Sequence, residues 1–430
     1  MIHLVKGPHA WTAGELLQVV RQRRATSRSK MAALTGLSPS TIAARVESLL
    51  SAGYLLEDGE QSGRGRKPRT LSVNADLGVV AAVDIGSRHT RIGFTDLAGT
   101  LLGVVEYSAP DRGDAATYLE WLTQRIQSGA AALDHPSHRA LRGIGVSIAS
   151  PVDRTTGKLI HPMHLPGWNS IDPAQTLSSA FGVPVVVDND ATVMALGEHR
   201  MHYPRVANML YIKLGSAIGC GIVIGGELYG GRSGGAGEIG HIPVDAPNYR
   251  RRCQCGRDTC LEACFGGAAI SEHLAIRGQG SEGDADFAAL AAARNPVAIE
   301  VLRDAGTHIG DAIGTLCNVF NPELVVIGGK LSQVEQLTHA LRASLYARAL
   351  PLNARDLEVV VSKNAADASI LGAAWQVIDL VLSTELVNQD LADYAETFDS
   401  TSSSTRRIDW STAPASTASS PSAEIRISGG

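Results

Sequence analysis

Three cysteines lie close together in the stretch CQCGRDTC, Cys253 to Cys260, in a chain that contains only six cysteines. Thiolates on one tight, glycine-containing turn suit zinc, whose structural sites take four tetrahedral ligands from cysteine and histidine. A glycine-rich run that ends in a histidine, GGAGEIGH, lies just upstream and offers the imidazole of His241 as a fourth ligand. We therefore predict a structural zinc site formed by His241, Cys253, Cys255 and Cys260.

The cysteines allow two other interpretations. A redox pair more often has the spacing Cys-x-x-Cys beside the start of a helix, and three clustered cysteines fit that pattern poorly. Buried structural thiols are expected to be scattered along the chain, as Cys220 and Cys317 are. Cys264 is an alternative ligand, although we expect it to pack on the helix that follows the cluster.

The composition describes an ordinary globular protein of two or three domains. The chain has 430 residues, of which 44% are hydrophobic and 19% charged. No apolar run is long enough to span a membrane, and the N-terminus lacks the pattern of a secretory signal. We therefore expect a cytoplasmic protein, in which clustered cysteines bind metal rather than form disulfides. The net charge of −5 excludes a uniformly basic nucleic-acid-binding chain but not a basic domain on an acidic body.

Such a basic domain is predicted at residues 1–75, where three short amphipathic helices fit residues 13–52. Ser27 is a candidate N-cap of the second helix, and Gly36 ends it. Ser38 is a candidate N-cap of the third helix, with Pro39 in its first turn. Two helices joined by a tight glycine-containing turn form a helix-turn-helix, whose second helix can enter the DNA major groove.

Two strand-like runs follow the third helix, and the basic loop GRGRKPR joins them. Arginine and lysine in such a loop can neutralise phosphates or enter a minor groove. We predict a winged helix-turn-helix that binds double-stranded DNA; the alternative is a small helical bundle that mediates only protein contacts. The expected DNA contacts are Ser38, Ser40, Thr41 and Arg45 on the third helix and Arg64, Arg66, Lys67 and Arg69 in the wing.

The rest of the chain contains a duplicated unit. Short strand-like runs around Asp84-Ile85-Gly86-Ser87 recur around Lys213-Leu214-Gly215-Ser216, so that Lys213 takes the place of Asp84. Internal similarity of this kind implies two α/β lobes that face one cleft. A glycine after the first strand of each unit lets the backbone approach a phosphate, although many strand turns also read Gly-Ser.

An ordered set of motifs resembles the ROK family (repressors, open reading frames and sugar kinases) over roughly residues 10–380. The motifs are Asp84-Ile85-Gly86, SPVD (150–153), LPGWN (165–169), VDNDA (187–191), GEIGH (237–241), CQCGRDTCLEA (253–263), NPELVVIGG (321–329) and SILGAA (369–374). The resemblance implies an α/β fold, with a winged helix-turn-helix followed by a duplicated, actin-like or ribonuclease-H-like ATPase-type domain of two lobes. It also assigns His241 as the fourth zinc ligand. The family usually has glycine where this chain has Thr259.

The resemblance further implies a sugar site built from side chains that hydrogen-bond to hydroxyl groups. Asn189 and Asp190 have a second interpretation, as the N-cap of a helix. One ring nitrogen of a zinc-bound histidine can bind the metal while the other faces a sugar or a carboxylate. The expected sugar-binding residues are Gly167, Asn189, Asp190, Glu238, His241 and Glu262.

In the kinases of the family, the residue that matches Asp190 is the base that accepts the proton of the attacking hydroxyl. Kinases have Asp-x-Gly-Gly-Thr after the first strand and a second loop that resembles Gly-Thr-Gly-x-Gly. This chain has Ser87-Arg88 in the first loop and Ala217 in the second. Because a Cβ atom at these positions crowds a bound phosphate, we expect no kinase activity.

These observations predict a cytoplasmic, zinc-containing, sugar-responsive transcriptional regulator of carbohydrate metabolism, and a repressor rather than an enzyme. The alternative is an ATP-dependent, glucokinase-like sugar kinase with an attached DNA-binding domain, in which Asp190 is catalytic. A two-fold operator calls for a homodimer or a tetramer. The expected domains are residues 1–75, a sugar-sensing domain at 76–385 (lobes of about 79–200 and 201–375, C-terminal helix of about 366–385) and a disordered tail at 386–430.

Overall fold

The structure is a computed structural model, and it describes residues 11–58, 69–86, 89–108, 113–133, 140–154, 156–160, 162, 165, 167–279, 287–363, 367–400 and 425–426. The N-terminal unit has three helices followed by a two-stranded antiparallel hairpin. Its elements are α1 (Ala13–Arg21), α2 (Arg28–Thr35), α3 (Pro39–Ser51), β1 (Leu55–Asp58) and β2 (Thr70–Val73).

Local chemistry accounts for these boundaries. The hydroxyl group of Ser27 accepts a hydrogen bond from the Lys30 amide, and that of Ser38 accepts one from Thr41, so both predicted N-caps are confirmed. Gly36 has a φ of 72°, the left-handed conformation in which glycine commonly ends a helix. The winged helix-turn-helix architecture expected from the sequence is therefore present.

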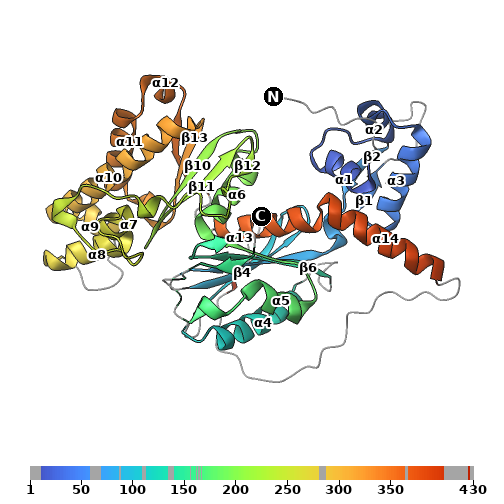
Figure 1. Ribbon diagram of the computed structural model, residues 1–430, viewed down its shortest axis with the longest axis horizontal. Coiled ribbons are helices and arrows are strands. Elements are labelled where there is room, and N and C mark those ends of the chain that lie inside the picture. Colours follow the sequence, from blue (N-terminus) through green and yellow to red (C-terminus); the bar gives the residue numbers. More distant parts are fainter. Residues whose placement is uncertain are drawn as a thin grey trace.

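The first lobe is built on a mixed sheet with the strand order β15-β5-β4-β3-β6-β9. Its strands are β3 (Val79–Ile85), β4 (Thr90–Asp96), β5 (Leu101–Tyr107), β6 (Leu141–Ile148), β9 (Val185–Asn189) and β15 (Ile425–Arg426). The smaller elements of this lobe are η1 (Ala75–Leu77), β7 (Val152–Asp153), β8 (Lys158–Leu159) and η2 (Trp168–Ser170). Helices α4 (Ala115–Ala131) and α5 (Pro173–Phe181) cover one face of the sheet (Figure 1).

The second lobe repeats this topology. Its sheet has the order β12-β11-β10-β13-β14, in which β10 pairs antiparallel with β11 and parallel with β13, just as β3 pairs with β4 and β6. The strands are β10 (Met209–Leu214), β11 (Ile218–Ile224), β12 (Glu227–Leu228), β13 (Leu324–Gly328) and β14 (Glu358–Val361). The duplication predicted from the sequence, with Lys213 in the place of Asp84, is therefore confirmed.

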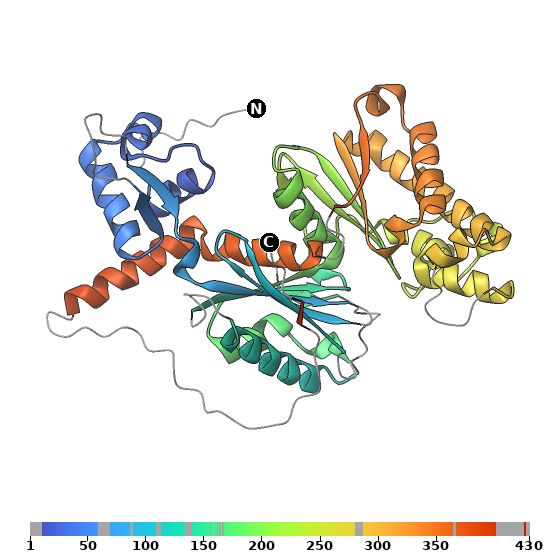
Figure 2. The same ribbon diagram turned by 180° about the vertical axis from the view of Figure 1, so that it is seen from behind.

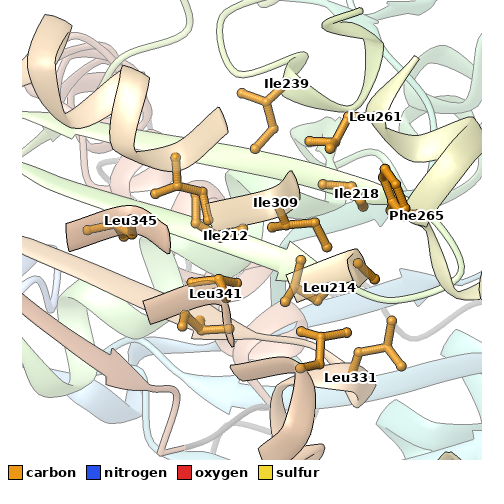
Figure 3. Close-up of a cluster of buried hydrophobic side chains, with 14 of the residues drawn as sticks. Ile212, Leu214, Ile218, Ile239, Leu261, Phe265, Ile309, Leu331, Leu341 and Leu345 are labelled. Atoms are coloured by element: carbon orange, nitrogen blue, oxygen red, sulfur yellow. The ribbon is translucent and has the colours of Figure 1, made fainter. Parts of the chain in front are cut away.

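The helices of the second lobe form its outer layer. They are η3 (Ile239–His241), η4 (Pro247–Tyr249), α7 (Leu261–Phe265), α8 (Gly267–Ile276), α9 (Phe287–Ala292), α10 (Pro296–Phe320), η5 (Lys330–Gln333), α11 (Glu335–Arg348) and α12 (Pro351–Ala354). Ile212 and Leu214 of β10 pack in one buried cluster with Ile309 of α10 and Leu341 of α11 (Figure 3). Burial of these apolar side chains fixes the sheet against the helices.

Three further helices join the units. Helix α6 (Asp190–His202) leads from the first lobe to the second, and α13 (Ala368–Val381) packs on it. Helix α14 (Thr384–Ser400) runs on from α13 and lies beside the helix-turn-helix (Figures 1 and 2). Among the described residues, no single helix is long and apolar enough to cross a membrane; only α13 with the first part of α14, bent by 51°, meets the length and composition test as a pair.

The segment 386–430, expected to be a disordered tail, begins instead within a helix. Helix α14 continues to Ser400, because Val387 is fully buried among the apolar residues of the N-terminal unit. The Asn388 side chain also hydrogen-bonds the Gly14 amide at 2.9 Å and the Thr12 hydroxyl at 3.0 Å. Further on, Ile425 and Arg426 pair with β5. Serine-rich composition therefore obscured the amphipathic helix that precedes it.

Candidate functional site

The residues predicted to bind zinc lie together. The ligand atoms of His241, Cys253, Cys255 and Cys260 all lie within 4.8 Å of one another. The Sγ atoms of Cys255 and Cys260 are 3.6 Å apart, and Cys253 Sγ is 3.4 Å from His241 Nδ1. Tetrahedral coordination with Zn–S bonds of about 2.3 Å places sulfur ligands roughly 3.8 Å apart, so the four donors can hold a metal ion such as zinc.

Buried neighbours of the ligands hold the two segments in place. Ile239 lies between Glu238 and His241 in the sequence, Leu261 follows Cys260, and both apolar side chains are buried in the core of the second lobe (Figure 3). Gly237, with a φ of 97°, permits the turn, since a Cβ there would lie 1.9 Å from the Cys220 carbonyl oxygen. The core of the lobe thus positions the cluster.

Thr259 occupies a backbone conformation that explains the usual glycine of the family at this position. Its φ is 56°, in the left-handed region that disfavours residues with a Cβ atom. The Thr259 amide donates to the Arg251 carbonyl oxygen, and its own carbonyl oxygen accepts from Val244. These two hydrogen bonds hold the turn although threonine stands where the family usually has glycine.

His241 connects the metal cluster to the predicted sugar site. Its Nδ1 atom faces Cys253, while Nε2 lies 3.9 Å from the Glu238 carboxylate. On the other side of the cluster, Glu262 follows Cys260 by two residues and accepts a hydrogen bond from the Ile218 amide at 3.1 Å. A metal ion at the cluster would therefore fix the positions of two carboxylates.

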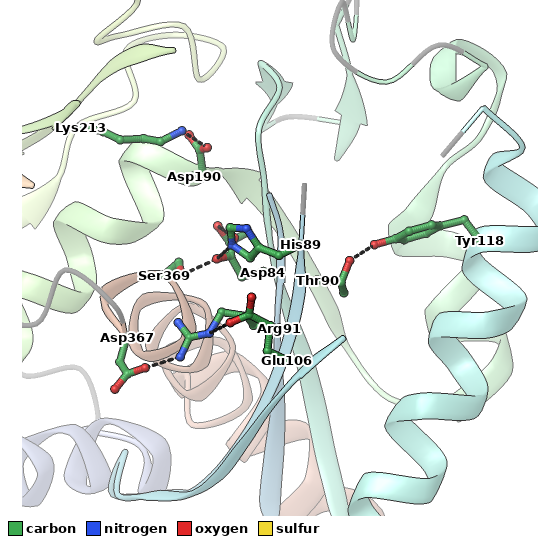
Figure 4. Close-up of polar contacts among 11 residues, drawn as sticks. Asp84, His89, Thr90, Arg91, Glu106, Tyr118, Asp190, Lys213, Asp367 and Ser369 are labelled. Carbon is green, nitrogen blue, oxygen red and sulfur yellow. Dashed lines mark hydrogen bonds and ion pairs between the residues drawn. The ribbon is translucent and has the colours of Figure 1, made fainter. Parts of the chain in front are cut away.

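Asn189 and Asp190 combine both roles considered for them. The side-chain oxygen Oδ1 of Asn189 caps α6 by accepting from the Ala191 amide, and its side-chain Nδ2 donates to the Ser150 carbonyl oxygen at 3.2 Å. Asp190 opens the helix and forms an ion pair with Lys213 of β10 (Figure 4). The helix cap therefore presents a charged carboxylate beside the second lobe.

The pKa shifts of Lys213 and Glu238 indicate that the predicted carboxylates lie near one another. Burial acts to lower the pKa of Lys213, but the carboxylates of Asp190, Asp84 and Glu262 raise it above its usual value. Burial also raises the pKa of Glu238, which His241 opposes, whereas Glu262 and Asp190 add to the rise. Groups from both lobes thus share one site, in which Lys213 supplies positive charge.

At the start of the first predicted phosphate loop, the Asp84 carboxylate and the Gly86 amide have partners within the protein. Asp84 accepts a hydrogen bond from Ser369 at 2.8 Å and lies 3.6 Å from His89 Nε2 (Figure 4). Although burial acts to raise the pKa of Asp84, His89 and Ser369 hold it below the usual range. The Gly86 amide donates to the His89 carbonyl oxygen, and a Cβ at Gly86 would lie 2.7 Å from the His89 ring. Ser87 and Arg88 lie outside the described residues.

The second loop also uses its amides internally. The Gly215 amide donates to the Ala217 carbonyl oxygen at 3.1 Å, and the Ile218 amide donates to Glu262. Phosphate-binding loops present such amides to the ligand instead. The described amides of Gly86, Gly215 and Ile218 are therefore all engaged within the protein.

Gly167, one of the expected sugar-binding residues, makes a close backbone approach to another part of the protein. Its φ is 90°, and a Cβ there would lie 2.4 Å from the Gly113 carbonyl oxygen. The contact seats the following residue, Trp168, whose buried ring lies 5.4 Å from that of Tyr118. A sugar contact of Gly167 remains a prediction.

The recognition helix α3 presents Ser40 at the surface and Thr41 half-buried, at the N-terminal end expected to reach DNA. Ser38 uses its hydroxyl group as the helix cap. Arg45 donates to the Trp11 carbonyl oxygen, and its contact with DNA remains a prediction. Arg69 pairs with Glu57 at 3.0 Å; the wing residues Arg64, Arg66 and Lys67 lie outside the described residues.

Two charged residues of the site were missed by sequence reasoning. Lys213 was noted as the counterpart of Asp84, but no role was given to its charge. Arg154 follows the SPVD motif and pairs with Asp188, the residue before Asn189, with Nε at 2.9 Å from the carboxylate. Gln376 of α13 also donates to Asp188 at 2.7 Å. The position of Arg154 directly after a quoted motif was the available clue.

Comparisons with known proteins agree with this architecture. The family model described as "ROK family" matches residues 80–379. A xylose repressor of Caldicellulosiruptor bescii is 26% identical over 86% of this chain and 95% of the relative. A glucokinase of Halalkalibacterium halodurans is 29% identical over 71% of this chain and 97% of the relative. A crystal structure of a ROK family transcriptional regulator, homologous to the E. coli MLC protein, superposes with a TM-score of 0.75 at 28% identity, covering 89% of this chain and 98% of that one.

Proposed function

The chain belongs to the ROK family, and on that premise we propose that it is a sugar-responsive transcriptional repressor that binds operator DNA through its winged helix-turn-helix. The observation that carries the proposal is the combination of this DNA-binding unit with a sugar-type site beside which the Gly86 and Gly215 amides are engaged within the protein. The xylose repressor and the MLC homologue, which match this chain over its N-terminal unit as well as its body, support it.

A sugar would bind between the lobes, through groups that donate to and accept from hydroxyls. Asp190 and Glu238 are acceptors, Asn189 supplies an amide, and Glu262 lies beside them. A sugar that bound one arrangement of the lobes more tightly would shift the population towards that arrangement. We assign the DNA-binding role to residues 1–75 and sugar sensing to the body that follows, in a homodimer or tetramer that matches a two-fold operator.

Zinc in this proposal is structural. His241, Cys253, Cys255 and Cys260 would hold the ion, which organises the turn between Glu238 and Glu262. The protein supplies the remaining order through the buried side chains of Ile239 and Leu261. Metal removal should therefore reduce both stability and sugar binding.

The second candidate function is a sugar kinase, because a glucokinase is among the relatives and Asp190 is retained. Three observations favour the repressor. The Gly86 and Gly215 amides are engaged within the protein, and Lys213 is paired with the would-be base. A proton acceptor held in an ion pair is better suited to accept a hydrogen bond from a sugar hydroxyl than to drive phosphoryl transfer.

The test measures sugar binding, DNA binding and turnover on one preparation. Thermal-shift and calorimetric titrations with D-xylose, D-glucose and N-acetyl-D-glucosamine would identify a ligand, and gel-shift titrations on a duplex selected from a random pool would measure DNA affinity. We expect a bound sugar to change DNA affinity and a coupled ADP-release assay to show no turnover. Sugar-dependent ADP release that Asp190→Asn abolishes would establish the kinase instead.

A further inference from the structure

Asp379, near the end of α13, accepts hydrogen bonds from two arginines that belong to different parts of the molecule. Arg21 Nη2, in the last turn of α1 in the helix-turn-helix, lies 2.7 Å from Asp379 Oδ1. Arg200 Nη2, in the last turn of α6, lies 3.0 Å from Asp379 Oδ2. One carboxylate therefore uses separate oxygens to bind the DNA-binding unit and the helix that begins at the sugar site.

Helix α6 is a direct link between Asp379 and that site. It begins at Asp190, which is paired with Lys213, and its last turn carries Arg200. Thirteen residues at about 1.5 Å per residue span roughly 20 Å. A movement of Asp190 on sugar binding would thus be carried along one rigid helix to Arg200.

Helix α13 gives a second connection in the same direction. Its first turn holds Ser369, which donates to Asp84, and its last turn holds Asp379. The two helices pack backbone against backbone, because a Cβ at Gly372 of α13 would lie 1.8 Å from the Val193 carbonyl oxygen of α6. Close packing of this kind leaves little freedom for one helix to slide without the other.

We propose that Asp379 is the positioning residue that transmits sugar binding to the helix-turn-helix, by joining Arg200 of α6 to Arg21 of α1. This inference rests on the proposed function and names how its site is regulated. When sugar binding moves α6, the Asp379 carboxylate moves with Arg200 and changes the position of α1. Both contacts are charge-assisted hydrogen bonds of partly buried groups; Arg21 is only 16% exposed.

The interface itself provides a matched control. The Tyr54 hydroxyl of the N-terminal unit donates to Asp390 of α14 at 2.6 Å. This hydrogen bond also joins the helix-turn-helix to the C-terminal helices, and among the described residues neither partner forms a hydrogen bond or ion pair with α6. Loss of the Tyr54–Asp390 hydrogen bond should weaken the packing of the helix-turn-helix on α14 and leave the Arg200–Asp379–Arg21 connection intact.

The experiment compares Arg200→Gln, Arg21→Gln, their combination and Tyr54→Phe in the full chain. Its first readout, hydrogen exchange of the α1 amides, needs no sugar. Arg200→Gln should speed exchange in α1 by about twofold or more, although Arg200 does not itself lie in the N-terminal unit. Unchanged exchange in α1 would overturn the proposal whatever the sugar response.

The second readout is the change in DNA affinity caused by the sugar identified above. Allosteric changes are typically about 5- to 150-fold, and Arg200→Gln should reduce the change by about threefold or more. In the combined variant, the sugar-induced change in DNA affinity should be reduced no further than in Arg200→Gln alone, because both substitutions break the same connection. Tyr54→Phe should retain the wild-type change.

The outcomes separate the two proposals. An equal loss of response in Tyr54→Phe and Arg200→Gln, or a full response in Arg200→Gln, would overturn the role of Asp379. If Arg200→Gln speeds exchange in α1 but no sugar changes the DNA affinity of the wild type, the connection stands and the sugar-responsive function fails.

Discussion

Asp84 and Lys213 occupy equivalent positions in the two lobes and carry opposite charges. Each is the penultimate residue of the first strand of its unit, β3 or β10, and each of these strands has a parallel neighbour, β6 or β13. The carboxylate of Asp84 contributes to the raised pKa of Lys213. The second lobe therefore carries a cation at the position where the first lobe carries a carboxylate.

Replacement of Lys213 by methionine should destabilise the protein. It would leave Asp190, a buried carboxylate, without its ion-pair partner, and breaking a buried pair in this way costs about 3–5 kcal/mol. The free energy of unfolding from urea titration would measure the loss. The double variant Lys213→Met/Asp190→Asn should recover much of it; a double variant whose loss equals the sum of both single losses would contradict the coupling.

Replacement of Cys255 by serine should release zinc. Removal of a direct ligand should weaken zinc binding beyond the roughly 10- to 100-fold that loss of a ligand's hydrogen-bond partner causes. Metal analysis would give the zinc content, and the variant should also lose thermal stability and sugar affinity, because Glu238 and Glu262 lie on either side of the cluster. Cys264→Ala is the control, since Cys264 lies outside the four ligands and should leave the zinc content unchanged. Normal sugar binding by a zinc-free Cys255→Ser protein would disprove the structural coupling.

Replacement of Thr259 by glycine should stabilise the turn. The left-handed conformation costs a residue with a Cβ atom about 1–2 kcal/mol, and glycine avoids this cost. Glycine also loses more backbone entropy on folding, which offsets about 0.5–1 kcal/mol of the gain. A net gain of about 0.5–1 kcal/mol should appear in chemical denaturation of the zinc-loaded protein. Thr259→Ala removes the same side-chain atoms but keeps the Cβ, so it should show no such gain; equal gains in both variants would place the cause elsewhere.

The combined replacement of Ser40 and Thr41 by alanine should reduce sequence-selective DNA binding. Base-edge contacts from the start of a recognition helix contribute about 1–3 kcal/mol of discrimination each. Gel-shift titrations on the selected duplex and on a scrambled duplex would separate selective from general binding. Arg69→Ala, in the wing, should instead weaken binding to both duplexes alike and lower the salt dependence. A double alanine variant that keeps full selectivity would exclude this end of α3 as the reader of sequence.

The parts of the site that sequence reasoning predicted are those fixed by local chemistry. The four residues predicted to bind zinc have donor side chains on two short segments, and the N-caps at Ser27, Ser38 and Asn189 depend on neighbouring amides. Lys213 and Asp379 act through partners distant in the sequence, which no local pattern reveals. Helical spacing also did not reveal the carbonyl oxygen of Trp11, to which Arg45 donates.

The packing of the N-terminal helix α1 against the C-terminal helix α14 was also not predicted from the sequence. The apolar face of α14 was hidden in a polar composition, and its partner α1 lies at the other end of the chain. Pairing of this kind is decided by tertiary packing, which short-range periodicity does not specify.

The order of synthesis gives this pairing a consequence for the newly made protein. The helix-turn-helix leaves the ribosome before Asp379, Asn388 and Asp390, the residues of α13 and α14 that form hydrogen bonds with it. A nascent chain that ends before α13 therefore lacks the hydrogen bonds that hold this unit against the body. The DNA-binding unit can take its docked position only after α13 and α14 have been synthesised.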